Sequence, residues 1–307
     1  MRALSRRAFL ATAAGLGGLG LGGYAFAVEP GLRLRVQRYA LTPPGWSPGL
    51  GLRLVILADL HAGMPSMPMA RVRRIIEVAN ALEPDLILLL GDYSNTDRLL
   101  RIRADWSEVV PALMALKAPL GRYAILGNHE WWDDPRAQKE RRGPTIAHRI
   151  FADTDIPLLE NDAARLVKDG RPFWLLGLGD QLAFHIARRR QIGVDDLAGT
   201  LAKVTDDAPA ILMAHEPDIF PRVPQRVSLT LSGHTHGGQV RMFGWSPVVP
   251  SQFGNRYAYG HVVEGGRHLI VSGGLGTVSA GLAPVRLGVP PEIVVVELGG
   301  EASTDVS

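Results

Sequence analysis

The chain has 307 residues, of which 46% are hydrophobic and 21% charged, and these proportions are typical of a globular protein rather than a disordered one. The net charge of +3 comes from three arginines within residues 1–28, because the rest of the chain carries 30 basic and 30 acidic residues. We therefore expect no nucleic-acid-binding surface. Cysteine is absent, which excludes disulfides, thiolate zinc sites and cysteine nucleophiles.

The first 28 residues have the features of a targeting segment. A basic start precedes an apolar, glycine-rich stretch over residues 11–28. Residues 5–10, SRRAFL, resemble the twin-arginine (Tat) export signal, and residues 25–27, AFA, offer a cleavage site. We therefore expect export to the periplasm or cell envelope, with the Tat machinery as a partner. The alternative is an uncleaved leader that anchors the protein in the membrane.

After the leader, the sequence predicts a single catalytic domain. Residues 29–50 form an entry segment that contains a Pro/Gly-rich turn. We expect the domain to occupy residues 51–300 and residues 301–307 to form a tail. No internal repeat or linker interrupts this region.

Five apolar runs of strand length occur in this domain, and each ends in polar residues that are capable of chemistry. Runs of this kind are typical of strands that are buried on both faces. They span residues 52–58, 86–90, 123–126, 211–214 and 227–231. The strand ends carry eight candidate site residues: Asp59, His61, Asp92, Asn128, His129, His215, His234 and His236.

Helical patterns separate the first strands. The apolar spacing over residues 72–82 predicts a helix, and residues 99–117 and 135–152 are less regular helix candidates. Strand-helix-strand alternation indicates an α/β domain with a largely parallel central sheet. Later apolar runs, around residues 164–177 and over residues 269–271 and 293–298, indicate a second sheet or antiparallel additions.

The candidate residues indicate a metal site, because ligands bind beyond the carboxyl ends of strands in open α/β sheets. Nitrogen and oxygen donors without sulfur suit Mn, Fe or Zn, and also Co or Ni. An all-oxygen Mg or Ca site is disfavoured by this many imidazoles. A carboxylate between two ligand clusters can bridge two ions about 3.5–4 Å apart, an arrangement suited to displacement at phosphorus.

The strand-end residues resemble, in type and order, the five motifs of the calcineurin-like metallophosphoesterases. The motifs are Asp59-x-His61, Gly91-Asp92, Gly127-Asn128-His129-Glu130, His215 and Gly233-His234-x-His236. LSGHTHGGQ at residues 231–239 and GGLG at residues 273–276 also resemble the bacterial YkuE/YaeI-type branch. The resemblance covers residues 50–298. It implies a four-layer αββα sandwich with two mixed β-sheets.

The resemblance also implies roles for these residues and a reaction. The implied roles are one divalent ion bound by Asp59, His61 and His236, a second bound by Asn128, His215 and His234, and Asp92 as the bridge between them. His129 would contact the phosphate and protonate the leaving oxygen. Glu130, where the family more often has aspartate, is expected to orient His129, and Glu216 is expected to lie outside the ligand set. The reaction would be hydrolysis of a phosphate mono- or diester by a metal-bound hydroxide.

Several alternatives stay open. The enzyme could instead be a membrane-associated UDP-2,3-diacylglucosamine pyrophosphatase of lipid A biosynthesis, and the chain could be a non-catalytic interaction scaffold. The substrate could be a lipid, a nucleotide or a wall polymer. Trp131, Trp132 and the loop over residues 242–259 either contact an apolar part of a substrate or pack on the core. We expect Arg188–Arg190 to be solvated and Asp180 to be structural.

Overall fold

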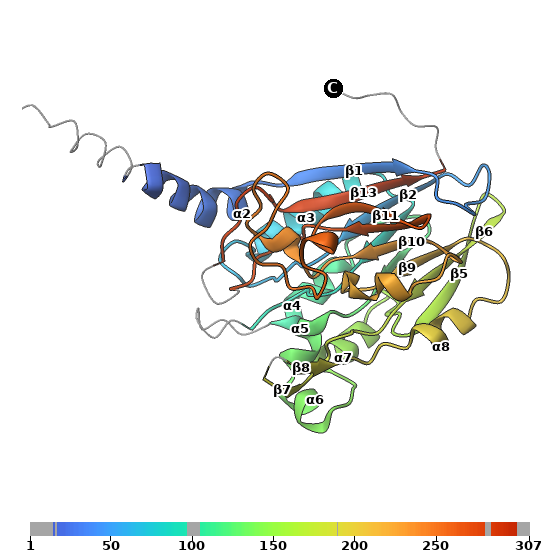
Figure 1. The fold of residues 1–307 in the computed structure, drawn as a ribbon. Coiled ribbons are helices and arrows are strands. Elements are labelled where there is room, and N and C mark those ends of the chain that lie inside the picture. Colours follow the sequence, from blue (N-terminus) through green and yellow to red (C-terminus); the bar gives the residue numbers. More distant parts are fainter. Residues whose placement is uncertain (1–14, 16, 97–104, 189, 280–283, 300–307) are drawn as a thin grey trace, which may run out of the picture.

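Two β-sheets packed face to face form the centre of the molecule (Figure 1). The computed structural model describes residues 15, 17–96, 105–188, 190–279 and 284–299. The first sheet has the order β1-β13-β2-β3-β4. Its strands are β1 (Arg35–Leu41), β2 (Leu52–Leu57), β3 (Leu86–Leu89), β4 (Arg122–Ala124) and β13 (Glu292–Leu298). β13 is antiparallel to β2, and the other neighbours are parallel.

The second sheet has the order β11-β12-β10-β9-β6-β5. Its strands are β5 (Asp162–Lys168), β6 (Arg171–Gly177), β9 (Ala210–Met213), β10 (Val227–Ser232), β11 (Gly260–Glu264) and β12 (Arg267–Val271). Two hairpins at its edges, β5–β6 and β11–β12, are antiparallel, and the inner pairs are parallel. A separate hairpin consists of β7 (Phe184–Ala187) and β8 (Arg190–Ile192).

Helices cover the outer faces of both sheets. The α-helices are α2 (Glu29–Leu32), α3 (Met69–Ala81), α4 (Trp106–Leu113), α5 (Asn128–Trp132), α6 (Pro135–Glu140), α7 (Ile146–Ala152) and α8 (Leu197–Ala202). The other helical turns are η1 (Tyr24–Val28), η2 (Pro217–Arg222), η3 (His236–Gly238) and η4 (Gly254–Tyr257). Helical residues 17–23 precede η1, and this N-terminal helix projects from the domain (Figure 1). Within the described part of the chain, no helix combines the length and the apolar character that crossing a bilayer requires.

Three apolar clusters hold the layers together. Residues of both sheets, among them Ile56, Leu88 and Ile211, form the cluster between the sheets. A second cluster joins the outer face of the first sheet to α3, α4 and α7. A third joins the outer face of the second sheet to α8, η2 and η4. The layers are therefore helix, sheet, sheet and helix, which confirms the α/β sandwich implied by the resemblance.

The strands that carry the motifs are divided between the two sheets. Residues 52–57, 86–89 and 122–124 lie in the first sheet, and residues 210–213 and 227–232 lie in the second. The strands of the central sheet that the alternation indicates are thus divided between two sheets, and the later runs around residues 164–177 and over residues 269–271 lie in the second, as one of the two expectations had it. The periodicity could not show this, because a strand between a helix layer and a second sheet is as apolar on both faces as one between two helix layers.

The expected helices agree with the structure only in part. Helix α3 buries Val72, Ile75, Ile76 and Ala79, as the spacing predicts. Residues 135–152 form two helices rather than one, because Arg141 has a left-handed backbone (φ 52°) and Pro144 cannot donate a helical hydrogen bond. Residues 97–104 lie outside the described residues, and of the described remainder of the 99–117 candidate only residues 106–113 form a helix. Strand β1, within the expected entry segment, forms the edge of the first sheet.

Candidate metal centre

The candidate residues gather at one end of the central strands. β1 follows the N-terminal helix directly, β13 runs parallel to β1, and β2 runs antiparallel to β13. The strands β2, β3 and β4 therefore end on the side from which that helix extends (Figure 1). The turns after β9 and β10 bring residues of the second sheet to the same place. Seven of the eight candidates are buried, and the side chain of His129 is 18% exposed.

Sharp turns at the strand ends aim these side chains inward. The candidates with a positive φ are Asp59 (53°), His61 (44°), Asp92 (55°), His234 (66°) and His236 (51°). This conformation is uncommon outside glycine and costs on the order of 1–3 kcal/mol per residue. The first two turns hold each other, because the Asp59 N–H donates to Gly91 O (3.1 Å) and the His61 N–H donates to Asp92 O (2.9 Å).

Two glycines allow the turns to approach one another. A Cβ on Gly127 would lie 2.4 Å from Asp92 Oδ1, and a Cβ on Gly233 would lie 2.6 Å from Asp59 Oδ2. Real Cβ atoms do not approach other atoms this closely, so only glycine fits beside these carboxylates.

Asp59, His61 and His236 form the first cluster of donor atoms. His61 Nε2 lies 3.0 Å from His236 Nε2, and Asp59 Oδ1 lies 3.8 Å from His236 Nε2. Beneath His236, the buried Arg286 places Nη2 3.1 Å from its Nδ1. The cluster thus brings two ring nitrogens and a carboxylate oxygen to one point.

Asn128, His215 and His234 form the second cluster. His215 Nδ1–H donates to Leu90 O (2.6 Å), and its Nε2 lies 3.3 Å from Asp92 Oδ2. His234 Nδ1 lies 2.8 Å from Asn128 Oδ1. The cluster thus brings imidazole nitrogens and an amide oxygen close to the buried Asp92 carboxylate.

The donor atoms fit divalent ions. Asp59 Oδ2 and His215 Nε2 are buried without a hydrogen-bond partner. Three groups have donor atoms within 4.8 Å of one another, namely Asp59, His61 and His236; His61, Asp92 and His129; and Asp92, His215 and His234. Asp92 belongs to two of these groups, and it is the residue for which the resemblance implies a bridging role. The ligand roles themselves stay a prediction.

Burial and neighbouring charges shift the pKa values of Asp59 and Asp92 in opposite directions. Burial, with the nearby charge of Asp92, raises the pKa of Asp59 to about 7. Burial would also raise the pKa of Asp92, but His215 and His129 bring it well below its usual range. Asp92 is therefore an anion among imidazoles, which suits a carboxylate that contacts cations.

The environment of His129 shows a residue that the sequence analysis missed. Its Nδ1 lies 3.5 Å from Oδ2 of Asp133, one helical turn further along α5. Burial lowers the pKa of His129, but Asp92 and Asp133 outweigh it and raise the pKa to about 9. The i, i+4 spacing from His129 was the available sequence signal for Asp133.

Glu130 was expected to orient His129, but its carboxylate points elsewhere. Its carboxylate accepts hydrogen bonds from the backbone N–H groups of Asp92 (2.8 Å), Tyr93 (3.0 Å) and Gly127 (2.7 Å). Because α5 begins at Asn128, the side chain of Glu130 points back over the first turn. Glu130 therefore joins two motif loops.

Residues near the site divide between core and surface roles. Trp131 packs with Ala137 and Phe184 in a small buried cluster. The ring of Trp132 lies 5.5 Å from that of His129.

Asp180 and Glu216 are buried next to each other, and burial with the charge of Glu216 raises the pKa of Asp180 well above its usual range. Of the expected solvated run, Arg189 lies outside the described residues.

A groove of about 300 Å³ opens beside the centre. Its floor includes Asp92, Asn128 and the three histidines His129, His234 and His236. One wall is apolar and consists of Trp132, Val240, Pro247, Val248, Pro250, Val278 and Val285. The expected loop over residues 242–259 therefore has two parts, because residues 247–250 line the groove whereas Phe253 and Tyr257 pack on the core.

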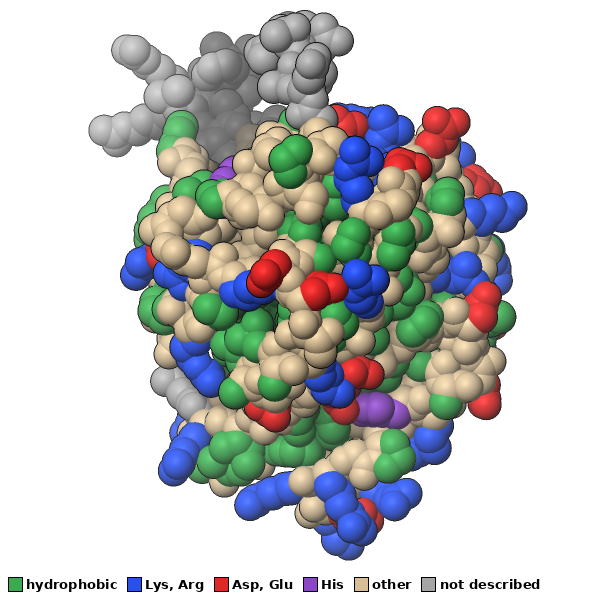
Figure 2. All heavy atoms as spheres, turned by 90° about the vertical axis from the view of Figure 1, so that its right-hand side faces the viewer, with side chains coloured by type: hydrophobic (Ala, Val, Ile, Leu, Met, Phe, Trp, Pro, Cys, Tyr) green, Lys and Arg blue, Asp and Glu red, His purple; other side chains and the backbone are tan. Residues whose placement is uncertain are grey.

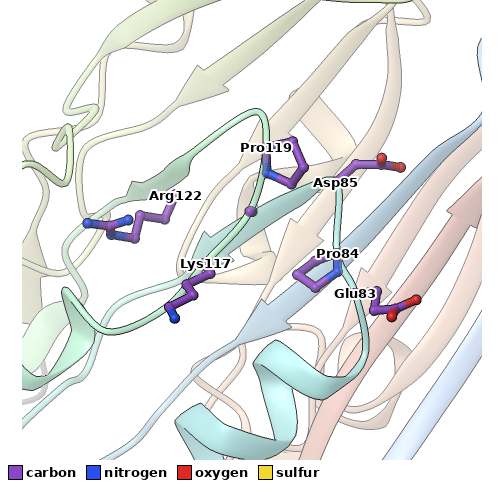
Figure 3. A pocket seen from close by; sticks show the side chains of 7 residues that line it. Glu83, Pro84, Asp85, Lys117, Pro119 and Arg122 are labelled. Atoms are coloured by element: carbon purple, nitrogen blue, oxygen red, sulfur yellow. The ribbon is translucent and has the colours of Figure 1, made fainter.

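A wider depression of about 550 Å³ lies at the amino ends of β3 and β4 (Figure 3). Its acidic and basic side chains lie on opposite sides and do not converge (Figure 3). Asp85 pairs with Lys168 (2.5 Å), and Arg122 pairs with Asp155 (2.5 Å). On this face of the molecule, basic and acidic side chains are interspersed (Figure 2). Nothing among these described residues resembles a metal or catalytic site.

Comparisons with known proteins give the family that this chain resembles. A family model described as calcineurin-like phosphoesterase matches residues 52–238. The metallophosphoesterase YkuE of Bacillus subtilis is 30% identical over 310 residues, which cover 97% of this chain and 99% of that protein. Phosphodiesterase YaeI of Escherichia coli is 31% identical over 302 residues, which cover 96% and 99%. The solved NAD nucleotidase of Haemophilus influenzae has a TM-score of 0.46 at 13% identity and covers 76% of this chain and 46% of its own.

Proposed function

Because the chain belongs to the calcineurin-like phosphoesterase family and is thus a hydrolase, we propose that it is an exported enzyme that uses two divalent ions to cleave a phosphate mono- or diester. The observation that carries the two-ion proposal is the position of Asp92. It is shared by two groups of donor atoms, one with His61 and His129 and one with His215 and His234, and His61 links the first of these to Asp59 and His236. Mn, Fe or Zn suits these donors.

In this proposal, Asp59, His61 and His236 hold one ion, Asn128, His215 and His234 hold the other, and Asp92 contacts both. When bound, the ions supply positive charge to the phosphoryl oxygens and acidify water at neutral pH. The left-handed turns keep the ligand side chains in place before any ion arrives. That preorganisation reduces the rearrangement needed to bind ions.

His129 is the proposed proton donor. Asp133 Oδ2 lies 3.5 Å from Nδ1 and favours a proton there, so we assign delivery of a proton to the leaving oxygen to Nε2. Its pKa of about 9 favours the protonated ring at neutral pH. Trp132 lies against His129 and donates from Nε1 to Leu182 O (2.7 Å), which fixes this wall of the groove.

A panel of phosphate esters tests the activity. Protein reconstituted with Mn²⁺, Fe²⁺ or Zn²⁺ is assayed on monoesters, diesters, nucleotides, wall polymers and UDP-2,3-diacylglucosamine. We expect hydrolysis of at least one class and its loss in chelator. Full activity in chelator, with no transition metal by elemental analysis, would contradict the metal-dependent mechanism. Cleavage of the UDP-acyl sugar alone would favour the pyrophosphatase alternative, which the apolar wall of the groove keeps open.

Export by the Tat route is also a proposal. Its support is the SRRAFL string and the confinement of the net charge to the leader. Replacing Arg6 and Arg7 with lysine should retain the protein in the cytoplasm, as measured by cell fractionation. Normal export of the double variant would remove the Tat proposal.

A further inference from the structure

The largest exposed apolar groups are concentrated at the site end of the molecule. Of thirteen large hydrophobic residues exposed in the described part of the chain, nine lie in two segments. The first segment is the N-terminal helix, with Leu19, Leu21, Phe26, Val28 and Leu32, and the second is the loop with Met242, Phe243, Trp245 and Val248. Scattered exposed apolar residues are ordinary, but a concentration of this kind marks an interaction surface.

The two segments are joined through a common neighbour. The N–H of Arg286 donates to Ala25 O in the helix (3.0 Å). The next residue, Leu287, accepts from the Arg241 N–H (2.8 Å), directly before the loop. The helix end and the loop therefore flank the same short stretch of chain, at the end of the molecule where the metal centre lies (Figure 1).

The loop contains a tight hairpin turn over residues 242–245, which we term the apolar hairpin. Met242 and Trp245 exchange two backbone hydrogen bonds, of 2.9 and 3.0 Å. Phe243 (φ 53°) and Gly244 (φ 78°) occupy the two central positions. Turns with a positive φ at both positions favour Asn-Gly, and phenylalanine is strained there. The hairpin holds this ring fully in solvent, with 106% relative exposure.

The apolar hairpin leads directly into the groove wall. Pro247, Val248 and Pro250 follow it and line the groove, together with Val278 and Val285. Val248 is both part of the wall and 63% exposed, so the apolar wall is continuous with the surface. At about 300 Å³, the groove is at the lower end of small-molecule sites and leaves limited room beyond a phosphate group.

We propose that the site takes a phosphate ester bearing a long hydrocarbon chain from a lipid surface, with the first carbons against the groove wall and the apolar hairpin seated in the lipid. This inference rests on the proposed phosphoesterase activity. A soluble nucleotide or sugar phosphate would leave the wall of Val248, Val278 and Val285 in contact with polar groups. A hydrocarbon chain covers that wall, and the lipid surface covers Phe243 and Trp245.

The first experiment measures the effect of chain length. Mn²⁺-loaded protein is assayed on methyl, butyl and octyl p-nitrophenyl phosphate, which share one leaving group, below their aggregation concentrations. We expect kcat/KM to rise by up to about fourfold for each methylene that the groove buries, and by at least about tenfold from methyl to octyl. The double variant Val278→Ser/Val285→Ser should flatten this rise. Val167→Ser, in an exposed residue of β5, is the matched control and should keep it.

The outcomes separate this inference from the proposed function. Because each variant is judged by its own octyl-to-methyl ratio, partial loss of folded or metal-loaded protein cancels. Hydrolysis of the methyl ester without any chain-length effect would overturn the inference and leave the phosphoesterase standing. No hydrolysis of any ester by metal-loaded protein, together with failure on the wider ester panel, would overturn both.

The second experiment tests the lipid surface with phosphatidylcholine vesicles. Phe243→Ser/Trp245→Ser should lower the vesicle-bound fraction of the full chain by at least about tenfold, because burial of two aromatic rings is lost. Trp245→Phe should keep binding but remove a blue shift of tryptophan emission, since Trp245 is 59% exposed. Val167→Ser should behave as wild type. Equal binding by the double serine variant would overturn the role of the hairpin.

Discussion

At the carboxyl ends of β2, β3 and β4 the acidic side chains of Asp59, Asp92 and Glu130 are buried, whereas at the amino end of β3 the carboxylate of Asp85 is partly exposed and forms an ion pair with Lys168. Asp92 is 2% exposed and lies among imidazoles, while the side chain of Asp85 is 24% exposed and lies against Lys168. The depression at the amino ends is the larger of the two. Convergence of buried donor atoms, rather than cavity size or charge, therefore distinguishes the end of the sheet that carries the candidate metal site.

The largest loss of activity should follow from Asp92→Asn, at the carboxyl ends of the strands. Loss of the shared carboxylate removes the anion that holds two cations together, so metal content and activity should fall together. We expect a rate loss of at least about 10³-fold, because metal ions contribute several kcal/mol to such reactions. Elemental analysis and kcat on one phosphate ester measure it. A variant with two ions and near-normal rate would show that Asp92 is not the bridge.

His129→Ala should separate proton transfer from metal binding at the same end. The variant should keep its ions and lose about 10²–10⁴-fold in rate if His129 is the general acid. The loss should shrink on nitrophenyl esters, whose leaving group needs no proton, and grow on alkyl esters. Equal losses on both esters would leave His129 a positioning or electrostatic role. Loss of metal would instead make it a ligand, which its proximity to His61 and Asp92 allows geometrically.

Glu130→Gln should lower stability, because it weakens the contact between two motif loops. The amide has one acceptor oxygen, so its NH₂ group would face a backbone N–H that the carboxylate now binds. We expect the free energy of unfolding to fall by about 1.5–3 kcal/mol. Denaturant titration of wild type and variant measures it. Glu140→Gln, in a carboxylate at the surface of α6, is the control and should change it by less than about 0.5 kcal/mol. Equal values for the two variants would show that the loops do not depend on Glu130.

Lys168→Ala tests the amino end and should have the smallest effect. Its partly exposed ion pair with Asp85 is expected to contribute about 0.2–1 kcal/mol to stability. Activity and metal content should not change, because the pair lies at the other end of the sheet from the centre. Measurable loss of either would show that the two ends are coupled.

The sequence predicted the positions of the strand-end residues but not the sheets that carry them. Asp59, Asp92 and His215 each follow an apolar run, so their clustering could be inferred from strand polarity alone. The apolar pattern did not assign these strands to two sheets, which only the resemblance implied, because periodicity records burial and not the partner layer. The apolar wall of the groove could not be predicted either. Val278 and Val285 belong to no recognisable motif, and they line the groove with the loop residues only in the folded chain.

The carboxylates next to His129 illustrate the same limit. Glu130 follows His129 in the chain and was expected to orient it, yet the helix turns Glu130 toward the loop backbones and brings Asp133 to the ring. Adjacent residues on a helix point in different directions, while residues four apart share a face. Had α5 been predicted as a helix, Asp133 would have been the better choice.

The central place of β13 has a consequence for biosynthesis. It is the last strand of the chain, yet it lies between β1 and β2. The turn at Asp59 is likewise held by late residues, because the N–H groups of Leu275 and Gly276 donate to Ala58 O and Asp59 O. A ribosome-bound chain that stops before residue 292 therefore has an open edge at β2 and a detached β1. We therefore expect the candidate metal site to form only after residues 292–298 have been synthesised.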